Sequence, residues 1–399
     1  MQAMVTLHII GISDSVPGFS PEIGKLIRET TQFAGGRRHL DLLAPLLPED
    51  ALLQPIEAPI QGLVRKITEL KGKWVILASG DPLFFGIGNT LIRAFPEAEI
   101  RIYPAHHSLQ LLAHRFKLPY GNFDTISLTG RSMDAFHEAL VRGVPRMGIL
   151  TDRKHTPAYL AEHMLEYGFR NYRMFYGERL GGEKEKTMEL SLEEARALKP
   201  AHPNCFFMEK TDEHNPKRGI PEEAFSHLKG RPNMITKLPV RLCTLSLMQL
   251  ENRKVFWDIG TCTGSVSIEA RLQYPHLQIT AFERREEARE LLLQNARRFQ
   301  APGIRFLPGD FLETPKEDLE KPDAVFLGGY GGKMEAILKE SDRHLIPGGI
   351  LAFNSVSDKS QKAFLSCSEK LGYRLEKRLE LKVDQHNLIT VLLASKRQL

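Results

Sequence analysis

The chain has 399 residues, of which 42% are hydrophobic and 26% charged, and its formal net charge is +5. These values are typical of a folded protein of two or three domains, and they exclude a disordered, collagen-like or fibrous chain. The small positive excess suits a polyanionic small molecule but is too weak to indicate a nucleic-acid-binding protein. Four scattered cysteines, none in a Cys-x-x-Cys pair, predict neither a disulfide framework nor a metal site and favour a reducing, cytoplasmic setting. We expect no membrane span and no signal peptide.

Short apolar segments alternate with helical patterns over the first 210 residues. This alternation predicts an α/β fold with largely parallel sheets. Helices are expected over residues 86–95 and 157–167. The predicted strands are Met4–Ile12, Lys73–Ser79, Ile100–Tyr103, Thr125–Leu128, Arg146–Thr151, Tyr172–Tyr176 and Cys205–Lys210.

A polar segment, residues 211–218, contains Pro216 and predicts a linker between two domains, 1–210 and 219–399. A second α/β series follows this linker. Its last part predicts an antiparallel hairpin, Tyr373–Val383 and Leu388–Ala394 joined by residues 384–387, added to the sheet edge. The other predicted strands are Val255–Ile259, Gln278–Phe282, Ile304–Pro308, Asp323–Leu327 and Ile350–Asn354.

The sharpest local signal is the segment VFWDIGTCTGSVSIE at 255–269, where an apolar strand runs into a glycine-containing turn and a helix then begins. Gly260 and Gly264 lack a Cβ, so they permit a tight turn and the close approach of a ligand. The helix start offers free N–H groups. Glu283 ends the next predicted strand, where it can accept hydrogen bonds from a ribose diol.

This Asp-x-Gly-x-x-x-Gly spacing differs from the Gly-x-Gly-x-x-Gly fingerprint of dinucleotide enzymes. With Asp258 at the strand end, it resembles motif I of the class I S-adenosylmethionine-dependent methyltransferases. The resemblance implies a Rossmann-like domain in which the turn holds the methionine part of the methyl donor. It also implies that Glu283 binds the ribose and Asp310, after the third strand, lies at the adenine. The alternative is a structural glycine turn in another Rossmann-like domain.

Two flanking features narrow the resemblance. They are Gly219-Ile220-Pro221 with Phe225 and Ile235-Thr236-Lys237 before the first strand of this domain, and FLGGYGG at 326–332 after its fourth. Together they resemble the decarboxylating precorrin methyltransferases that act at C15, over essentially all of residues 219–399. The resemblance implies that Thr236 lies in the donor site and Lys237 at substrate carboxylates. Tyr330 stands where that family usually has serine, and it is a candidate catalytic residue on the substrate side.

The N-terminal half carries a different set of turns after its predicted strands. They are ASGDPLFFG at 78–86, GGRRHL at 35–40, GERLGG at 177–182, and Thr151-Asp152 with Thr156-Pro157. Singly each is an ordinary turn, but their order and spacing resemble the tetrapyrrole methylase family, in particular the members that methylate C5 of a cobalamin precursor. The resemblance implies two α/β subdomains with S-adenosylmethionine between them, and Gly11, Gly80, Asp81 and Thr151 in the donor site. The sequence departs from the family at residues 11–14 (GISD), 104–108 (PAHHS), 129–131 (TGR) and at His155.

The two halves together resemble a family of fused, decarboxylating precorrin methyltransferases. The resemblance implies methylation at C5 by the N-terminal domain and at C15 by the C-terminal domain, with decarboxylation of the C12 acetate, two S-adenosylmethionine sites and no metal. It also implies a homo-oligomer that binds a tetrapyrrole and neither nucleic acid nor membrane. Arginine forks suit carboxylates, so we expect Arg37, Arg38 and Arg131 to bind the substrate periphery. His106 or His107 is a candidate proton acceptor.

Two other functions stay open at this point. Class I enzymes that methylate tRNA share the arrangement of Asp258 and Glu283, but such an enzyme should carry a basic surface or an added RNA-binding module. The N-terminal half, with altered loops at Ser13 and Ala105, could instead be a silent binding module. A chain with one active domain would bind one equivalent of S-adenosylmethionine rather than two.

Overall fold

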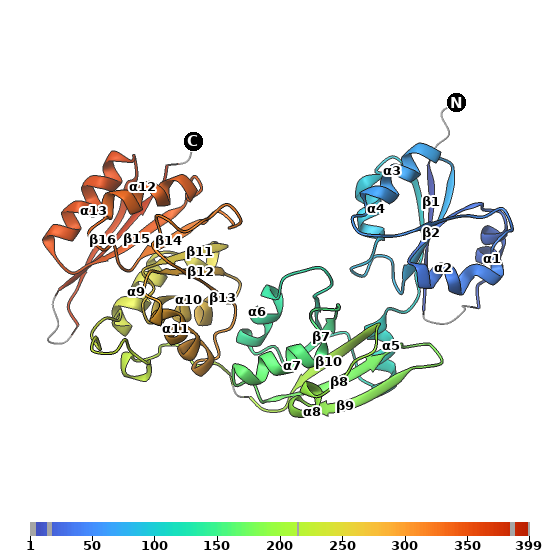
Figure 1. The fold of residues 1–399 in the computed structure, drawn as a ribbon, viewed down its shortest axis with the longest axis horizontal. Helices are drawn as coiled ribbons and strands as arrows, with labels where there is room; N and C mark the ends of the chain where they lie inside the picture. Colours follow the sequence, from blue (N-terminus) through green and yellow to red (C-terminus); the bar gives the residue numbers. More distant parts are fainter. Residues whose placement is uncertain (1–4, 14–17, 214, 384–387, 398–399) are drawn as a thin grey trace. The chain divides into compact units, whose positions relative to one another are not determined.

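Three β-sheets with flanking helices make up the described part of the chain, residues 5–13, 18–213, 215–383 and 388–397 (Figure 1). The structure is a computed structural model. It divides into two compact units, one of residues 1–131, 145–162 and 172–211, the other of residues 132–144, 163–171 and 212–399. Among the described residues, no helix has both the length and the apolar character needed to cross a membrane.

The first sheet of unit 1 is wholly parallel, with the strand order β3-β2-β4-β1-β5. Its central strands read as continuous apolar runs because helices cover both faces. The first strand begins at Thr6; Met4 lies outside the described residues. The elements are β1 (Thr6–Ile12), α1 (Pro21–Arg28), β2 (Gln32–Gly35), α2 (Arg37–Leu43), η1 (Ala44–Leu46), β3 (Leu52–Pro55), α3 (Gln61–Leu70), β4 (Lys73–Ser79), α4 (Gly88–Ala94) and β5 (Glu99–Tyr103).

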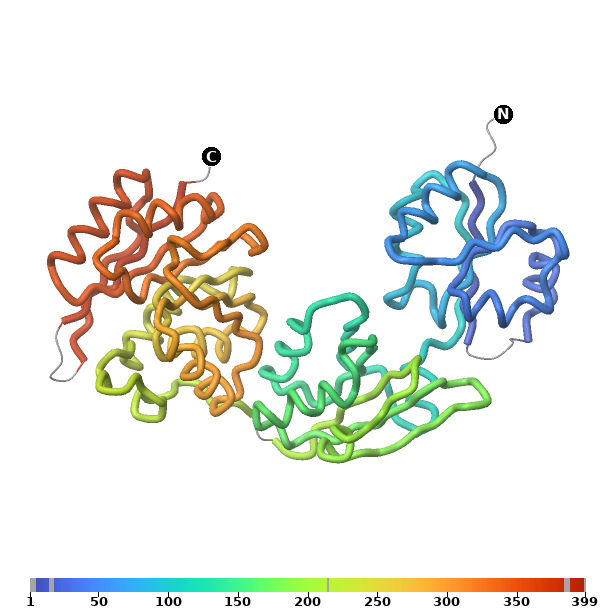
Figure 2. Tube along the Cα trace, in the orientation of Figure 1, coloured from blue at the N-terminus to red at the C-terminus, as the bar shows by residue number. Residues whose placement is uncertain are grey.

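The second sheet is an exception to the largely parallel arrangement of the other two sheets. Its order is β6-β7-β10-β8-β9, and all its pairs except β6–β7 are antiparallel. A short connection joins β8 to β9, and parallel strands would need a crossover of a dozen or more residues; the hairpin is the long light-green loop in Figure 2. The elements from residue 108 to 210 are α5 (Ser108–Phe116), β6 (Asp124–Ser127), α6 (Asp134–Arg142), β7 (Arg146–Leu150), α7 (Pro157–Glu166), β8 (Tyr172–Glu178), β9 (Lys186–Ser191), α8 (Leu192–Arg196) and β10 (Asn204–Lys210).

The sheet of unit 2 has seven strands in the order β13-β12-β11-β14-β15-β17-β16. The pairs from β13 to β15 are parallel. Strand β17 pairs antiparallel with both β15 and β16, which confirms the predicted hairpin; residues 384–387 lie outside the described residues. The elements are η2 (Glu222–Ala224), α9 (Leu238–Leu247), η3 (Leu250–Asn252), β11 (Val255–Ile259), α10 (Ser265–Gln273), β12 (Gln278–Glu283), α11 (Glu287–Arg298), β13 (Ile304–Pro308), β14 (Ala324–Leu327), α12 (Met334–His344), β15 (Ile350–Ser355), α13 (Asp358–Lys370), β16 (Arg374–Leu381) and β17 (Ile389–Ser395).

Side-chain alternation along β11 divides the core of this sheet. Trp257 and Ile259 pack on the side of α12 and α13, whereas Phe256 packs on the side of α9 and α10. The chain passes from β11 outward to β12 and β13 and then returns to β14 on the other side of β11. Such a reversal of strand order leaves a crevice at the carboxyl ends of the central strands.

Strand β16 forms one of the two outer edges of this sheet and is exposed over most of its length. Its sequence, RLEKRLEL, carries charges at five of eight positions. Arg374 pairs with Glu376 and Arg378 with Glu380 along the strand.

Candidate active sites

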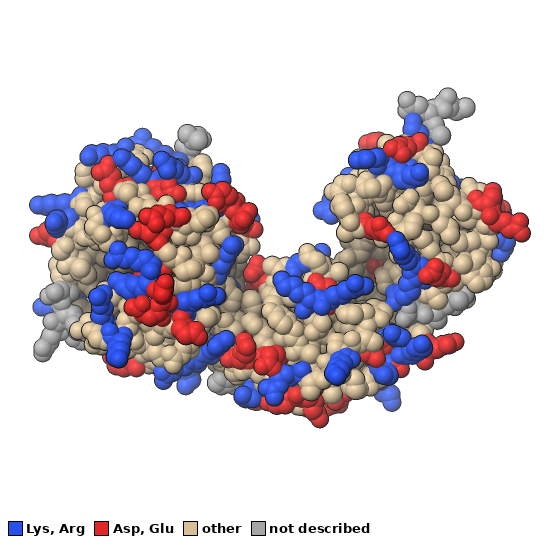
Figure 3. Space-filling view, in the orientation of Figure 1, with Lys and Arg blue, Asp and Glu red and all other residues tan. Residues whose placement is uncertain are grey.

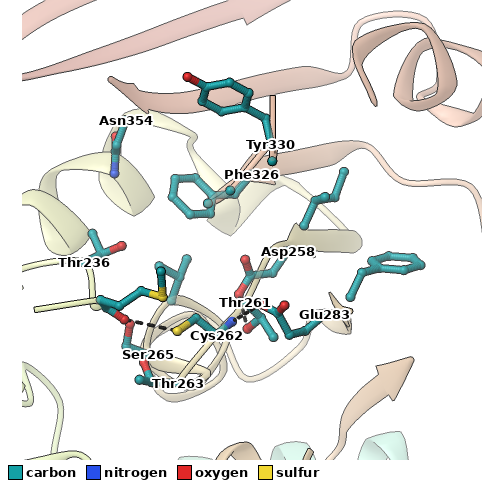
Figure 4. Close-up of a pocket in the computed structure, with 18 of the residues that line it drawn as sticks. Thr236, Asp258, Thr261, Cys262, Thr263, Ser265, Glu283, Phe326, Tyr330 and Asn354 are labelled. Carbon is teal, nitrogen blue, oxygen red and sulfur yellow. Dashed lines mark hydrogen bonds between the residues drawn. The ribbon is translucent and has the colours of Figure 1, made fainter. Parts of the chain in front are cut away.

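A cavity of about 530 Å³ lies at the carboxyl ends of β11, β12 and β14. This volume falls within the range of roughly 300–1,000 Å³ that small-molecule sites occupy, and the cavity lies where the strand order reverses. Its walls are the turn 258–266, the segments 282–285 and 309–311, the loop 328–333 and the segment 233–237 (Figure 4).

The turn after β11 depends on its two glycines. Gly260 has φ +77°, and a Cβ placed there would lie 2.7 Å from the backbone nitrogen of Gly329. Gly264 has φ +78°, and its Cβ would lie 2.8 Å from the Leu292 side chain. Any side chain at Gly260 would therefore separate the two loops that form this end of the cavity.

Asp258 is fully buried in the cavity wall. Its Oδ2 accepts hydrogen bonds from Thr261 Oγ1 at 2.7 Å and from Ser267 Oγ at 2.6 Å. Its Oδ1 has no hydrogen-bond partner within the described part of the chain. Burial raises the pKa of this carboxyl to about 6, although both hydroxyls favour its charged form. One carboxylate oxygen is thus available to a donor group on a ligand.

Glu283 joins the end of β12 to the glycine turn. Its Oε2 accepts a hydrogen bond from Cys262 N at 3.1 Å, which helps to hold Cys262 at φ +55°. Its Oε1 accepts from the backbone nitrogens of Arg284 and Arg285 and, at 2.9 Å, from the Arg285 guanidinium. A carboxylate oxygen can accept two hydrogen bonds, so Oε2 keeps capacity for a hydroxyl in the cavity.

The other residues predicted for this domain also line the cavity. Asp310 Oδ2 accepts from Lys333 Nζ at 2.8 Å, and this hydrogen bond lowers the pKa of Asp310. Lys237 lies 3.6 Å from Glu222. Tyr330 makes an edge contact with the Phe353 ring at 5.9 Å. Thr236 lies across the cavity from Glu283 (Figure 4).

Behind this wall lies a buried ion pair that was not predicted from the sequence. Arg241 and Glu269 are both fully buried, 3.4 Å apart. Glu269 also accepts hydrogen bonds from the backbone nitrogens of Gly219 and Ile220, and Arg241 donates to the carbonyls of Ile220 and Thr236. The pair therefore ties the segment before α9 to helix α10. The sequence feature that could have revealed this pair is a charged residue within a largely apolar helical pattern, Arg241 in α9 and Glu269 in α10.

In unit 1, three backbone segments meet where β1 and β4 end. A Cβ on Gly11 would lie 1.9 Å from the carbonyl oxygen of Gly80 and 2.7 Å from Ala105 N. Gly80 has φ +62°. The cavity beside them is only about 90 Å³, and Arg38, His106 and Gly80 line it. The structure thus brings together Gly11, Gly80, Arg38 and His106.

The remaining residues predicted for this half have other surroundings. Asp81 Oδ1 accepts from Leu83 N at 2.8 Å and forms a local turn. Thr151 Oγ1 lies 2.6 Å from Asn204 O. Arg37 pairs with Glu57 at 2.7 Å on the surface, and the Arg131 guanidinium lies 4.9 Å from the centre of the Phe85 ring.

His107 caps helix α5 and does not line the small cavity. Its Nδ1 accepts a hydrogen bond from Gln110 N, and its ring stacks on Phe84 at 3.7 Å. Burial lowers the pKa of His107 to about 4, although the nearby Asp81 opposes that shift. The ring is therefore neutral at neutral pH, with its acceptor nitrogen engaged in the cap.

Two family models match the chain, the Tetrapyrrole (Corrin/Porphyrin) Methylases over residues 18–196 and the Precorrin methyltransferase domain over residues 224–390. A Sinorhizobium protein named precorrin-6Y C(5,15)-methyltransferase (decarboxylating) is 33% identical over 376 residues, which cover 92% of this chain and 88% of the relative. A Salmonella typhimurium cobalt-precorrin-6B C(15)-methyltransferase (decarboxylating) is 40% identical over 145 residues, 36% of this chain and 74% of that protein. A crystal structure of precorrin-6y C5,15-methyltransferase from Geobacter metallireducens is 32% identical, covers 45% of this chain and 97% of that chain, and gives a TM-score of 0.41. On the full-length match, the chain belongs to the family of decarboxylating precorrin-6Y C5,15-methyltransferases.

Proposed function

We propose that the chain methylates a cobalamin-pathway precorrin at C5 through residues 1–210 and at C15 through residues 219–399, and that it releases the carboxyl group of the C12 acetate as CO₂. The observation that carries this proposal is the match to a decarboxylating C5,15-methyltransferase over 92% of the chain. The cavity at the carboxyl ends of β11, β12 and β14 supports it, because the residues predicted to bind the methyl donor lie in its walls and its volume suits a small-molecule site.

The residues of the C-terminal cavity fit S-adenosylmethionine, the methyl donor of this family. The buried Oδ1 of Asp258 lacks a partner among the described residues and suits the donor's cationic amine. The Gly260 turn leaves space that a Cβ would fill, and Glu283 Oε2 can accept from a ribose hydroxyl. We propose a second donor site at Gly11 and Gly80, where the small cavity of unit 1 lies.

The main contribution of the protein to methyl transfer is to align the methyl donor with the acceptor carbon. The donor supplies an activated methyl group on a sulfonium, and the acceptor carbons belong to conjugated, enamine-like systems. Holding the two at near-attack distance can supply several kcal/mol of the barrier. In the decarboxylation, the carbon–carbon bond to the carboxylate breaks, its electron pair passes into the conjugated imine of the ring, CO₂ leaves, and a proton is then taken up at carbon.

Product masses test the proposal directly. The full chain, incubated with the tetrapyrrole and S-adenosylmethionine, is expected to give a product with two added methyl groups and one CO₂ lost. A product with one methyl group would instead indicate a silent domain. Calorimetric titration with S-adenosylhomocysteine should then show two equivalents bound, and a single equivalent would contradict the two-site proposal.

The surface does not favour the alternative of an RNA methyltransferase. On the face drawn in Figure 3, Lys and Arg are interspersed with Asp and Glu over the elements of unit 2. An RNA-binding module usually gathers basic residues into a patch or stripe. Salt-dependent binding of tRNA in a filter assay would revive that alternative.

Arg38→Ala is expected to raise KM for the C5 step by about ten- to a hundredfold, because a hydrogen bond to a charged group contributes roughly 1.5–3 kcal/mol. Arg38 lines the cavity of unit 1. Arg37, the adjacent residue, is the matched control, since it pairs with Glu57 on the surface. Steady-state rates of C5 methylation measure both variants. Equal values of KM for Arg37→Ala and Arg38→Ala would remove the assignment.

Affinity of the C-terminal site for S-adenosylhomocysteine is expected to increase as pH rises through about 6, where Asp258 ionises. The charged carboxylate attracts the ligand's amine, whereas the protonated form does not. Because the pKa is raised above 3.8 in the folded protein, the associated stability is complete below pH 3.8 and is lost as pH rises through about 6. Titrations from acid to neutral pH measure the affinity, and Asp258→Asn should flatten the profile. An unchanged profile in that variant would assign the inflection to another group.

A further inference from the structure

Asn354 is a polar side chain in the C-terminal cavity that the donor site does not use. It lies near the end of β15 and lines the cavity. Strands β14 and β15 pair in parallel, and the last pair is Leu327 with Phe353. Asn354 therefore lies next to Gly328, the residue that follows Leu327 in the FLGGYGG loop. Figure 4 shows it above Thr236, on the side of the cavity away from Glu283.

The side-chain amide of Asn354 contacts a hydroxyl of helix α9 through its oxygen atom. Its Oδ1 accepts a hydrogen bond from the hydroxyl of Thr244 at 3.0 Å; the single proton of that hydroxyl, which belongs to a buried residue of α9, is shared with the carbonyl oxygen of Val240 at 2.7 Å. Its Nδ2 is buried, and within the described part of the chain it has no hydrogen-bond partner. A buried amide N–H without a partner costs free energy unless a ligand accepts from it. The arrangement therefore indicates that a ligand supplies the missing acceptor.

The charged side chains around the cavity are mostly paired with one another, which leaves Asn354 as a neutral donor for a ligand. Three of the basic side chains that line it already face acidic partners: Lys237 with Glu222, Arg285 with Glu283, and Lys333 with Asp310. The fourth, Arg284, is exposed and lies beside Gly331. Phe326, Tyr330 and Val356 contribute uncharged wall. Asn354 thus offers a neutral donor in a cavity whose substrate carries acidic side chains.

We propose that the Asn354 amide binds the substrate carboxylate that leaves as CO₂, and that Thr244 is a positioning residue that holds the amide in place. This inference rests on the proposed function. A carboxylate that becomes neutral CO₂ loses its charge in the transition state, so a bound cation would stabilise the reactant more than the transition state and slow the step. Hydrogen bonds from neutral donors are weaker than those from cations. An amide therefore orients the group while opposing its departure less. As CO₂ leaves, the electron pair of the broken carbon–carbon bond passes into the ring imine, and a proton is then taken up at carbon.

Two substitutions at this position test the proposal in the full chain. The probe is the tetrapyrrole that the wild-type protein dimethylates and decarboxylates, with S-adenosylmethionine. In Asn354→Ala, products that retain the carboxyl group are expected to accumulate, and CO₂ loss should slow by about tenfold or more. In Asn354→Asp, which preserves size but repels an anion, binding of the carboxylate should weaken, so CO₂ loss at subsaturating tetrapyrrole should slow further. C5 methylation should not change. The affinity of the C-terminal site for S-adenosylhomocysteine should also stay the same, which shows that the domain around Asn354 is folded.

Each other outcome overturns the inference. Wild-type CO₂ loss in Asn354→Ala means that the amide does not act on the carboxylate. Full activity of Asn354→Asp means that the amide oxygen, not the nitrogen, faces the ligand. Loss of S-adenosylhomocysteine binding to the C-terminal site means that Asn354 supports the donor site or the fold instead. Absence of methyl transfer and CO₂ loss in the wild-type protein is a separate result, because it rejects the proposed function itself.

Thr244 supplies a second, independent test. Thr244→Val keeps the side-chain shape and removes the hydroxyl, so it should slow CO₂ loss severalfold without changing C5 methylation. Thr244→Ser restores the hydroxyl and should recover most of the wild-type rate. If the serine variant were as slow as the valine variant, packing rather than the hydroxyl would account for the effect, and the positioning role would be rejected.

Discussion

Gly260→Ala is expected to abolish binding of S-adenosylhomocysteine to the C-terminal site and with it C15 methylation, while C5 methylation continues. The backbone at this position has φ +77°, which costs an L-residue roughly 1–2 kcal/mol. The larger effect comes from the added Cβ, which would lie 2.7 Å from Gly329 N and 3.0 Å from Gly329 O. These are backbone atoms, so relief requires the two loops to separate. Calorimetric titration and product masses measure both consequences.

Gly230→Ala is the matched control for that experiment. Gly230 has φ +72°, but a Cβ placed there meets no atom within 4 Å. This variant therefore carries the conformational cost alone, and it should retain donor binding and C15 methylation. If Gly260→Ala bound the ligand as well as Gly230→Ala does, the close approach of the two loops would not be needed for the site.

Arg241→Met is expected to lower the free energy of unfolding of unit 2 by about 3–5 kcal/mol, because it leaves the Glu269 carboxylate buried without its cation. The variant also loses the hydrogen bonds to the carbonyls of Ile220 and Thr236. The chain has two tryptophans, and Trp257 lies in the core of unit 2. Urea unfolding followed by fluorescence in a Trp74→Phe background therefore reports this unit. Affinity for S-adenosylhomocysteine should also fall, since Thr236 lines the cavity.

Lys339→Met provides the comparison with an exposed ion pair. Lys339 lies 2.8 Å from Glu335 on the surface of α12, and solvent-exposed pairs of this kind often contribute nothing measurable. We expect no change in the unfolding transition of this variant. Replacing both partners, as in Arg241→Met with Glu269→Leu, should recover part of the stability lost by Arg241→Met alone. An Arg241→Met transition equal to that of Lys339→Met would show that the buried pair does not stabilise the unit.

Local sequence patterns predicted the strands whose residues are buried in the fold, and they missed strands that are short or exposed. Strand β11 was found because all of its residues except Asp258 are apolar, and its predicted and observed bounds coincide. Strands β2 and β3 were missed because each has only four residues and ends at Gly35 or Pro55, which read as turn residues. Strand β9 was missed because its sequence, KTMELS, is polar and largely exposed. The antiparallel order of β8 to β10 depends on long-range pairing that no local pattern encodes.

The candidate site was predictable where one short segment supplies it. Asp258, Gly260 and Gly264 are close in sequence, so their spacing alone indicated a ligand turn; their roles stay predictions. The sequence could not distinguish the roles of adjacent residues such as Arg37 and Arg38. Their side chains leave α2 in different directions, so that Arg37 lies at the surface and Arg38 lines a cavity. The contact of Asn354 with Thr244 joins residues 110 apart in sequence, and nothing local marks either residue.

The charged outer strand of unit 2 also bears on how copies of the chain could meet. An unpaired strand edge is a template for a strand from another molecule, and charged side chains discourage that pairing. Strand β16 places Arg374, Glu376, Arg378 and Glu380 along this edge. Continuous sheets that run from one copy into the next through this edge, and aggregation by the same route, are therefore disfavoured. If the chain forms the expected homo-oligomer, we expect its interface not to pair β16 with a strand of another copy.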